Sequence, residues 1–293
     1  MGKDIHDAFP AAKAVFQEAD RILGIALSRL CFEGPEEELR ATINAQPALL
    51  TVSYACLLAG REASALPPPA YLAGHSLGEY TALLAAGAMD FATTLRLARE
   101  RGRLMFEAGQ AVPGTMAAVI GMEEGPLAQV CAESGAVIAN INCPGQIAIS
   151  GGQDPVARAC TLAKARGAAR AIPLAVSGAF HSPLMEPARS AMARILASTA
   201  FKDPSPPVIA NTTAQPITRA GEVSPELLAQ LCHCVQWQRS VEYMLAQGVT
   251  TFIEIGPGKV LAGLIRRISR DAQVINVGDT ASLNGLPRPG SAA

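Results

Sequence analysis

The chain has 293 residues, of which 49% are hydrophobic and 17% charged, so it can bury a large core and global disorder is excluded. Its 24 basic and 25 acidic side chains leave a formal charge of -1, which argues against a general nucleic-acid or membrane-surface binder. No segment approaches the roughly 18 consecutive apolar residues of a membrane span, and the charged N-terminus lacks the apolar core of a signal peptide.

The cysteines and histidines predict a cytoplasmic protein without a metal site. Seven cysteines are scattered along the chain with no C-x-x-C spacing, and there are only four histidines. Reduced thiols are the simplest interpretation of such a pattern. We therefore expect no metal and no redox cofactor.

Short apolar runs alternate with helical periodicity, which predicts an α/β protein with a largely parallel sheet. In the first part, 1–112, we expect helices over 8–31, from about Pro47 to Gly60, over 79–89 and over 93–108, and a strand over 70–73. After residue 178 we expect helices over 183–198, around 240–248 and over 259–269, and strands over 207–213 and 250–256. Residues 280–293, rich in Gly, Pro, Ser and Ala, are predicted to be a disordered tail.

Residues 113–178 follow a different pattern, strand-helix-strand-strand-helix-strand. This order is typical of a ferredoxin-like unit. We interpret it as a small domain inserted into a larger domain formed by 1–112 and 179–279.

The sequence Gly74-His75-Ser76-Leu77-Gly78 lies between the short strand and an apolar helix. A G-x-S-x-G turn in this context strains the serine and exposes its hydroxyl, and we expect both glycines to avoid side-chain clashes. The start of the helix favours developing negative charge. Ser76 is therefore the candidate nucleophile; the alternative is an ordinary turn in which Ser76 caps the helix.

A serine nucleophile needs a base, and we favour His181 among the four histidines. It follows a predicted strand and precedes a helix, as loop-borne catalytic groups often do. His6 is expected on a solvated helix face, His233 as a partly buried structural residue, and His75 points away from its neighbour Ser76. Arg101 is the candidate group for an anionic substrate, although arginines at 99, 101 and 103 are more often a solvated face.

Several segments together resemble the malonyl-CoA:acyl-carrier-protein transacylases, from Met1 to about Arg270. The resemblance rests on GHSLGEY (74–80), Arg101-Gly102, NINCPGQ (140–146), GAFHS (178–182) and EIGPG (254–258). It implies an α/β-hydrolase-like large domain with an inserted ferredoxin-like domain. It also implies transfer of a malonyl group from malonyl-CoA to acyl carrier protein, in fatty acid or polyketide synthesis.

The resemblance assigns roles residue by residue. Ser76 would carry the malonyl group, His181 would be its base, and Gln230 would orient the histidine by hydrogen bonding. Arg101 would bind the malonyl carboxylate, and the Leu77 N–H would donate to the oxyanion.

Further positions are expected to bind substrate. Gln46 and Asn140 match polar positions at the border of the acyl pocket, and His75 adjoins the nucleophile. Phe180 before the histidine and Leu77 after the serine match the pattern associated with malonyl rather than methylmalonyl selectivity.

The N-terminus differs from that of the family that this sequence resembles. Family members open with a strand and a Gly-Gln-Gly-Ser-Gln loop whose glutamine N–H completes the oxyanion hole, whereas this sequence matches from the segment after that loop. We therefore expect weakened catalysis.

The last predicted helix and its end carry positive charge from Lys259, Arg266, Arg267 and Arg270. An acidic carrier protein could dock there, or these side chains could simply be solvated.

Two other functions are compatible with these residues. A serine esterase or thioesterase shares the nucleophile motif, although such hydrolases place Asp or Glu between the serine and a histidine near the chain end. A carrier-binding homologue with impaired catalysis is the second alternative.

Overall fold

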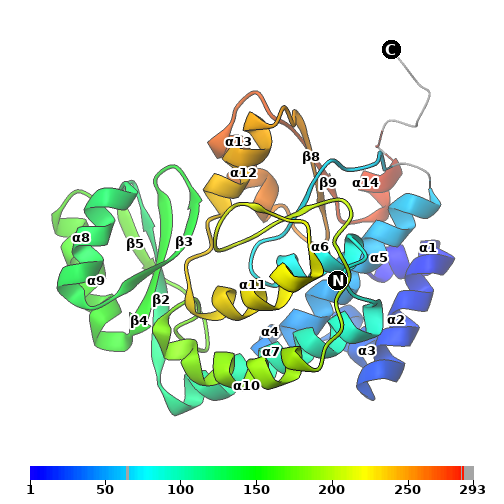
Figure 1. The fold of residues 1–293 in the computed structure, drawn as a ribbon, viewed down its shortest axis with the longest axis horizontal. Helices are drawn as coiled ribbons and strands as arrows, with labels where there is room; N and C mark the ends of the chain where they lie inside the picture. Colours follow the sequence, from blue (N-terminus) through cyan, green and yellow to red (C-terminus); the bar gives the residue numbers. More distant parts are fainter. Residues whose placement is uncertain (64–65, 285, 287–293) are drawn as a thin grey trace.

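The computed structural model describes residues 1–63, 66–284 and 286, and it contains two structural units (Figure 1). One unit is a small sheet with two helices at one end of the molecule. The other is a larger, mostly helical unit that carries the rest of the chain. The predicted α/β class is confirmed.

The first part of the large unit is mainly helical. Its elements are α1 (Lys3–Ala8), α2 (Pro10–Leu23), α3 (Leu27–Glu33), α4 (Glu36–Arg40), α5 (Thr42–Glu62), β1 (Leu72–Ala73), α6 (Leu77–Ala85) and α7 (Phe91–Ala111). The single helix predicted over 8–31 was wrong: Gly24, at φ 65°, ends α2 in the left-handed conformation that glycine adopts most easily.

Helix α5 begins at Thr42, five residues before the predicted start, and continues through Pro47. Proline has no N–H to donate to the carbonyl of Ile43, one turn earlier. Arg99 of α7 supplies the missing donor, with Nη1 3.0 Å from the Ile43 oxygen. A side chain from another helix therefore lets α5 extend beyond the limit that its own sequence predicts.

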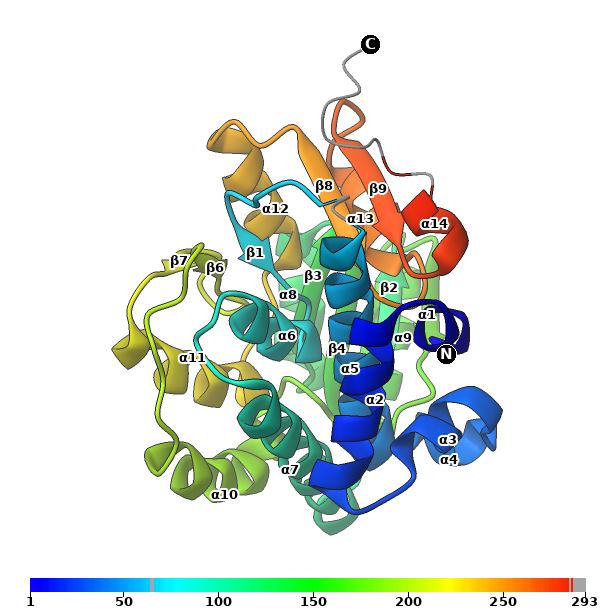
Figure 2. The same ribbon diagram turned by 90° about the vertical axis from the view of Figure 1, so that its right-hand side faces the viewer.

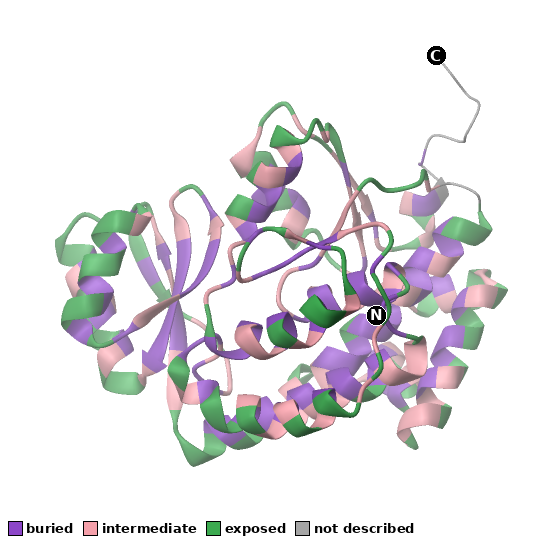
Figure 3. Cartoon of the chain, in the orientation of Figure 1, coloured by how far each residue is buried: buried purple, intermediate pink, exposed green. Residues whose placement is uncertain are grey.

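Helix α5 runs through the centre of the large unit between α2 and α7 (Figure 2). It is long and apolar enough to cross a membrane by length and composition alone, but 61% of its most apolar 18-residue window is buried. The purple positions along it in Figure 3 match a helix that lies in the core of a folded protein. Its composition is explained by this burial.

The small unit has the predicted order. It contains β2 (Gly114–Ile120), α8 (Glu124–Ser134), β3 (Val137–Cys143), β4 (Gln146–Gly152), α9 (Gln153–Ala165) and β5 (Arg170–Pro173). The sheet order is β3-β4-β2-β5 with antiparallel pairing throughout, which is the ferredoxin-like arrangement. The limits 113 and 178 remain a prediction.

The chain then returns to the large unit. Its elements are a 3₁₀ turn (Pro183–Met185), α10 (Glu186–Ala197), β6 (Val208–Ile209), β7 (Pro216–Ile217), α11 (Ala220–Cys232), α12 (Trp237–Ala246), β8 (Thr251–Ile255), α13 (Val260–Ile268), β9 (Gln273–Val277) and α14 (Thr280–Asn284). The sequence did not predict β7, α11 or β9. The predicted disordered tail was wrong for 280–284, which form α14; residues 285 and 287–293 lie outside the described residues.

The parallel pairs of the large unit belong to two small sheets. β1 pairs in parallel with β6, β6 pairs in antiparallel with β7, and β8 pairs in parallel with β9. The first sheet is the more important for function, because β1 leads directly into the GHSLG turn.

The segment between α11 and α12 joins the two units. The Val235 N–H donates to the Ala139 carbonyl and the Val235 carbonyl accepts from the Ile141 N–H, each over 2.9 Å. Arg239 forms an ion pair with Glu124 of the small unit at 2.6 Å. These contacts fix the C-terminal end of α11, which carries one of the candidate site residues.

Candidate active site

Ser76 occupies a strained turn between β1 and α6. Its φ of 53° and ψ of -110° lie outside the regions that an L-residue ordinarily adopts. A Cβ at Gly74 would lie 2.0 Å from the backbone C and O of Gly78, so a side chain at 74 is excluded. A Cβ at Gly78 would meet nothing within 4 Å, so the expectation that both glycines relieve a clash was wrong for Gly78.

This difference predicts opposite effects of alanine at the two glycines. Gly74→Ala should destabilise the fold by about 3 kcal/mol or more, because the methyl group overlaps backbone atoms that cannot move aside. Gly78→Ala, inside α6, should be neutral or stabilise by up to about 1 kcal/mol through helix propensity. Urea denaturation of both variants measures this, and equal stabilities would contradict it.

His181 lies beside the nucleophile. Ser76 Oγ is 2.9 Å from His181 Nε2, and His181 Nδ1 donates to the Gln230 carbonyl over 2.7 Å. Because Nδ1 carries the hydrogen that it donates to the carbonyl, Nε2 of the neutral ring is unprotonated and can accept the serine proton. No hydrogen bond joins the other histidines to Ser76 among the described residues. His6 packs against Phe16 and Phe32. His233 is exposed, so the expectation of a partly buried residue was wrong.

The pKa of His181 is lowered to about 3. Burial is the largest cause, and the charge of Arg101 is the second, whereas the bond to the Gln230 carbonyl raises it. The imidazole is therefore neutral at physiological pH, as a base requires.

Gln230 contacts the site through two parts of the residue. Its backbone carbonyl, rather than its side chain, holds His181. Its side-chain Oε1 accepts from Arg101 Nη2 over 2.7 Å, and its Nε2 donates to the Ser76 carbonyl over 2.9 Å. The side chain thus links the guanidinium to the nucleophile turn, a role that sequence reasoning did not predict.

Arg101 is buried, with 2% of its surface exposed, so the interpretation as a solvated face does not apply to it. Residues two apart on a helix point in nearly opposite directions, and Arg103 is half-exposed and paired with Glu100 and Glu107. Arg101 Nη2 lies 3.1 Å from Ser76 Oγ, and Nη1 donates to Gln46 Oε1 over 2.7 Å.

Gly102 allows Arg101 to reach this position. A Cβ at Gly102 would lie 2.6 Å from the Thr42 carbonyl, so the glycine lets α7 lie directly against the first turn of α5. That close approach brings Gln46 and Arg101 together.

Sequence reasoning missed three residues that contact this cluster. The Tyr80 ring lies under the guanidinium, with Arg101 Cζ 5.6 Å from its centroid. Glu79 is fully buried beside Gln230, and Asn211 Oδ1 accepts the Ser76 N–H over 2.7 Å. Spacing could have identified Glu79 and Tyr80, which lie one helical turn after Ser76. No local signal identifies Asn211, which arrives from the segment after β6.

The remaining predicted residues lie outside the hydrogen-bonded cluster. His75 Nε2 is 2.9 Å from Asn142 Oδ1, and its ring packs near Trp237. Asn140 is buried with no hydrogen-bond partner for its Nδ2 among the described residues. Phe180 is half-buried between the two units, in contact with the large hydrophobic core and with the β2–β4 face of the small sheet.

Leu77 is the first residue of α6. An N–H at that position has no acceptor within its own helix, so it is available to a ligand.

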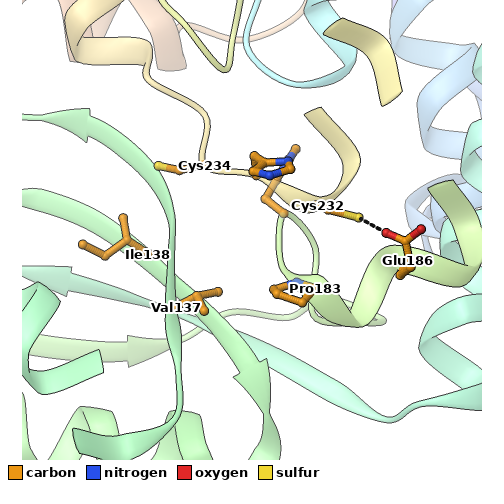
Figure 4. A pocket seen from close by; sticks show the side chains of 8 residues that line it. Val137, Ile138, Pro183, Glu186, Cys232 and Cys234 are labelled. Carbon is orange, nitrogen blue, oxygen red and sulfur yellow. Dashed lines mark hydrogen bonds between the residues drawn. The ribbon is translucent and has the colours of Figure 1, made fainter. Parts of the chain in front are cut away.

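A groove of about 550 Å³ has His181 among its lining residues (Figure 4). Its lining comes from the edge strand β3, the loop and 3₁₀ turn that lead into α10, the first residue of α10, and the end of α11 with the two residues after it: Val137, Ile138, His181, Pro183, Glu186, Cys232, His233 and Cys234. Neither Ser76 nor Arg101 lines it. Burial raises the pKa of Cys232 to about 11 and of Cys234 to about 12, so these thiols are poor nucleophiles. Among the described residues, no three His, Cys, Asp or Glu side chains are grouped as metal ligands.

Comparisons with known proteins give the family of the chain. Residues 1–288 match the model of the acyl transferase domain. The chain belongs to this acyl transferase family.

Its relatives are consistent in name and structure. The chain is 47% identical to the malonyl CoA-acyl carrier protein transacylase of Bacillus subtilis, over 97% of this chain and 90% of that protein. It is similar to the acyl carrier protein S-malonyltransferase of Vibrio cholerae, with a TM-score of 0.94 and 41% identity over 98% of this chain and 95% of that one. A malonyl-transacylase solved in complex with a type II PKS acyl-carrier protein matches with a TM-score of 0.93 and 41% identity, over 98% and 94% of the two chains.

Proposed function

We propose that this protein transfers a malonyl group from malonyl-CoA to the phosphopantetheine thiol of acyl carrier protein through a malonyl-Ser76 intermediate. The observation that carries the proposal is the buried Arg101 guanidinium, 3.1 Å from the Ser76 hydroxyl that also contacts His181. A cation held beside a nucleophile fits an acyl group that ends in a carboxylate.

In the first half-reaction, Ser76 Oγ attacks the thioester carbonyl while His181 Nε2 takes the hydroxyl proton. The oxyanion forms near the N-terminus of α6, where the Leu77 N–H donates to it. The C–S bond then breaks, and His181 returns the proton to the departing thiolate of coenzyme A. The enzyme is left as a malonyl ester and free coenzyme A is released.

The second half-reaction is the reverse with a different thiol. The carrier protein's thiol loses its proton to His181 and attacks the ester carbonyl. The Ser76–acyl bond breaks, and the serine oxygen recovers the proton from His181. Every step uses side chains and backbone groups of this chain, so the proposed mechanism needs no metal or redox cofactor.

Arg101, whose Nη1 donates to Gln46 Oε1, provides the proposed selectivity. The malonyl carboxylate would accept from the guanidinium, which acetyl-CoA cannot match, because an acetyl group leaves the buried cation without an anion. The positive charge of Arg101 is also one of the causes that lower the pKa of His181. A bound malonyl carboxylate offsets that charge and so should raise the basicity of His181 when the correct substrate is present.

The remaining expectations belong to the same proposal. His75, Asn140 and Phe180 would border the acyl and thiol-bearing groups. We propose a cytoplasmic enzyme of fatty acid or polyketide synthesis, since its relatives are named for malonyl transfer to acyl carrier protein. A hydrolase is less well supported, because the base is oriented by a backbone carbonyl and no carboxylate contacts it among the described residues.

The test is mass spectrometry of the intact protein after brief incubation with malonyl-CoA, followed by addition of holo acyl carrier protein. The proposal expects one malonyl adduct, which then moves to the carrier. Release of free malonate as the main product, with carrier present, would indicate a hydrolase. Binding of the carrier without any acyl-enzyme would indicate a non-catalytic homologue.

The lowered pKa of His181 predicts the pH dependence. The imidazole stays neutral well below the ordinary histidine value of about 6.5, so kcat/KM should not halve near pH 6.5 as acid is added. The midpoint of the acidic limb of kcat/KM should lie more than about one pH unit below 6.5. The midpoint of the kcat limb should lie at a higher pH than that of kcat/KM, because bound malonyl offsets the Arg101 charge.

Initial acylation rates between pH 4.5 and 8 measure both profiles. A kcat/KM limb at the ordinary histidine value would mean that His181 is solvated in the free enzyme. The free energy of unfolding should also decrease in acid. Because His181 has a lower pKa in the folded than in the unfolded chain, the unfolded chain binds the proton first, and stability is lost as pH falls from about 6.5 toward 3.

A further inference from the structure

Glu79 is a buried carboxyl group that no step of the proposed mechanism uses. It lies on α6, three residues after Ser76, with none of its surface exposed. All of its partners are donors: the Asn211 N–H at 2.8 Å, Asn211 Nδ2 at 3.3 Å and Gln230 Nε2 at 2.5 Å. A carboxyl group surrounded only by donors dictates which end of each neighbouring amide must face it.

The first amide that Glu79 orients is that of Asn211. With Nδ2 turned toward Glu79 and the Gly74 carbonyl, Oδ1 is left to accept the Ser76 N–H over 2.7 Å. A reversed Asn211 amide would place its oxygen against two acceptors and its nitrogen against a donor. Glu79 therefore helps hold the strained turn at Ser76 in one conformation.

The second amide is that of Gln230. With Nε2 turned toward Glu79 and the Ser76 carbonyl, Oε1 must face Arg101, where it accepts from Nη2 over 2.7 Å. Reversal of this amide would point a donor at the guanidinium. The position of Arg101 beside Ser76 thus depends on an acceptor whose orientation Glu79 and the Ser76 carbonyl set together.

We propose that Glu79 is a positioning residue that acts through the Gln230 amide on Arg101, and thereby determines selectivity for acyl groups that carry a carboxylate. It touches neither Ser76 Oγ nor the guanidinium in any hydrogen bond among the described residues, so its effect is indirect. The inference rests on the proposed malonyl transfer, whose selectivity it explains one layer further from the substrate.

The first variant is Glu79→Gln. Its amide can still accept from Asn211, but its NH₂ group then faces Gln230 Nε2, so one of the two amides must reverse. We expect a rise of about tenfold in KM for malonyl-CoA, the cost of one lost charge-assisted contact, while acetyl-CoA is affected much less. The ratio of the two kcat/KM values should fall accordingly.

The second test combines E79Q with Gln230→Met, which removes the amide that lies between Glu79 and Arg101. If Glu79 acts through that amide, E79Q should change the malonyl-to-acetyl ratio no further once position 230 is Met. If the two residues act independently, their effects on the ratio should multiply, which would overturn the inference.

Glu226→Gln is the matched control. Glu226 is another buried carboxyl group, on α11, and it accepts from the Thr212 N–H and hydroxyl rather than from Gln230. The control should leave the malonyl-to-acetyl ratio unchanged. Melting temperatures of all variants separate a loss of fold from a loss of selectivity.

An E79Q variant with the wild-type ratio, in a protein that forms malonyl-Ser76, would overturn this inference alone. An equal fall in kcat for both thioesters, with unchanged KM, would do the same, because it would mark Glu79 as a structural residue only. If E79Q does not fold, Glu79→Met decides, because it removes the acceptor without introducing a donor: a lowered ratio supports the inference and a wild-type ratio overturns it. A wild-type protein that forms no malonyl-serine would overturn the proposed function as well.

Discussion

Ser76→Ala should abolish both the malonyl adduct and transfer to acyl carrier protein. The serine oxygen forms the bond that carries the acyl group. Cys232 and Cys234 line the same groove as His181, but the raised pKa values of their thiols make them poor substitutes for the serine. Loss of a nucleophile from such a serine–histidine pair lowers kcat by a factor on the order of 10⁶.

Mass spectrometry of the intact protein and peptide mapping of the adduct check this prediction. Ser150→Ala is a suitable control, because Ser150 is a buried serine on β4 of the small unit, away from the nucleophile turn. It should be labelled and should turn over like the wild type. A label on a cysteine, or an adduct that persists in the alanine variant, would contradict the assignment.

Arg101→Ala should reverse the preference for malonyl over acetyl thioesters. A charge-assisted hydrogen bond contributes about 1.5 to 3 kcal/mol, so kcat/KM for malonyl-CoA should fall by roughly 10- to 150-fold. Acetyl-CoA should be retained or gained as a substrate, because the variant no longer buries a cation that an acetyl group cannot pair.

Arg103→Ala is the matched control for that experiment. Arg103 lies two residues further along α7, is half-exposed, and is paired with Glu100 and Glu107. Exposed pairs of this kind contribute roughly 0 to 1 kcal/mol, so neither thioester should be affected appreciably. An unchanged malonyl-to-acetyl ratio in Arg101→Ala would show that Arg101 does not read the substrate.

These two predictions separate chemistry from recognition. In the proposed mechanism, Ser76 and His181 would serve any acyl thioester, whereas Arg101 would distinguish malonyl from acetyl thioesters. Because Glu79 is inferred to act on selectivity through Arg101, its variants should resemble a mild form of Arg101→Ala rather than of Ser76→Ala.

Local sequence determined the parts of this protein that depend on neighbouring residues. The strand-turn-helix at GHSLG, the ferredoxin-like order of 113–178 and most helices were predicted, because spacing and turn chemistry act over a few residues. The same local rules misplaced the start of α5, since the donor that compensates Pro47 is Arg99, from a different helix. They also placed the predicted disordered tail over the five residues of α14.

Only the tertiary structure decided which of these residues meet and in what state. The three arginines of 99–103 are alike in sequence, and burial of Arg101 follows from the contact of α7 with α5 at Gly102. Likewise, the carbonyl rather than the side chain of Gln230 holds His181, because α11, absent from the sequence prediction, presents that carbonyl to the site. Contacts between residues more than 100 positions apart, such as Ser76 with Asn211, leave no periodicity in the chain. They are set by packing of whole elements, which no short window of sequence encodes.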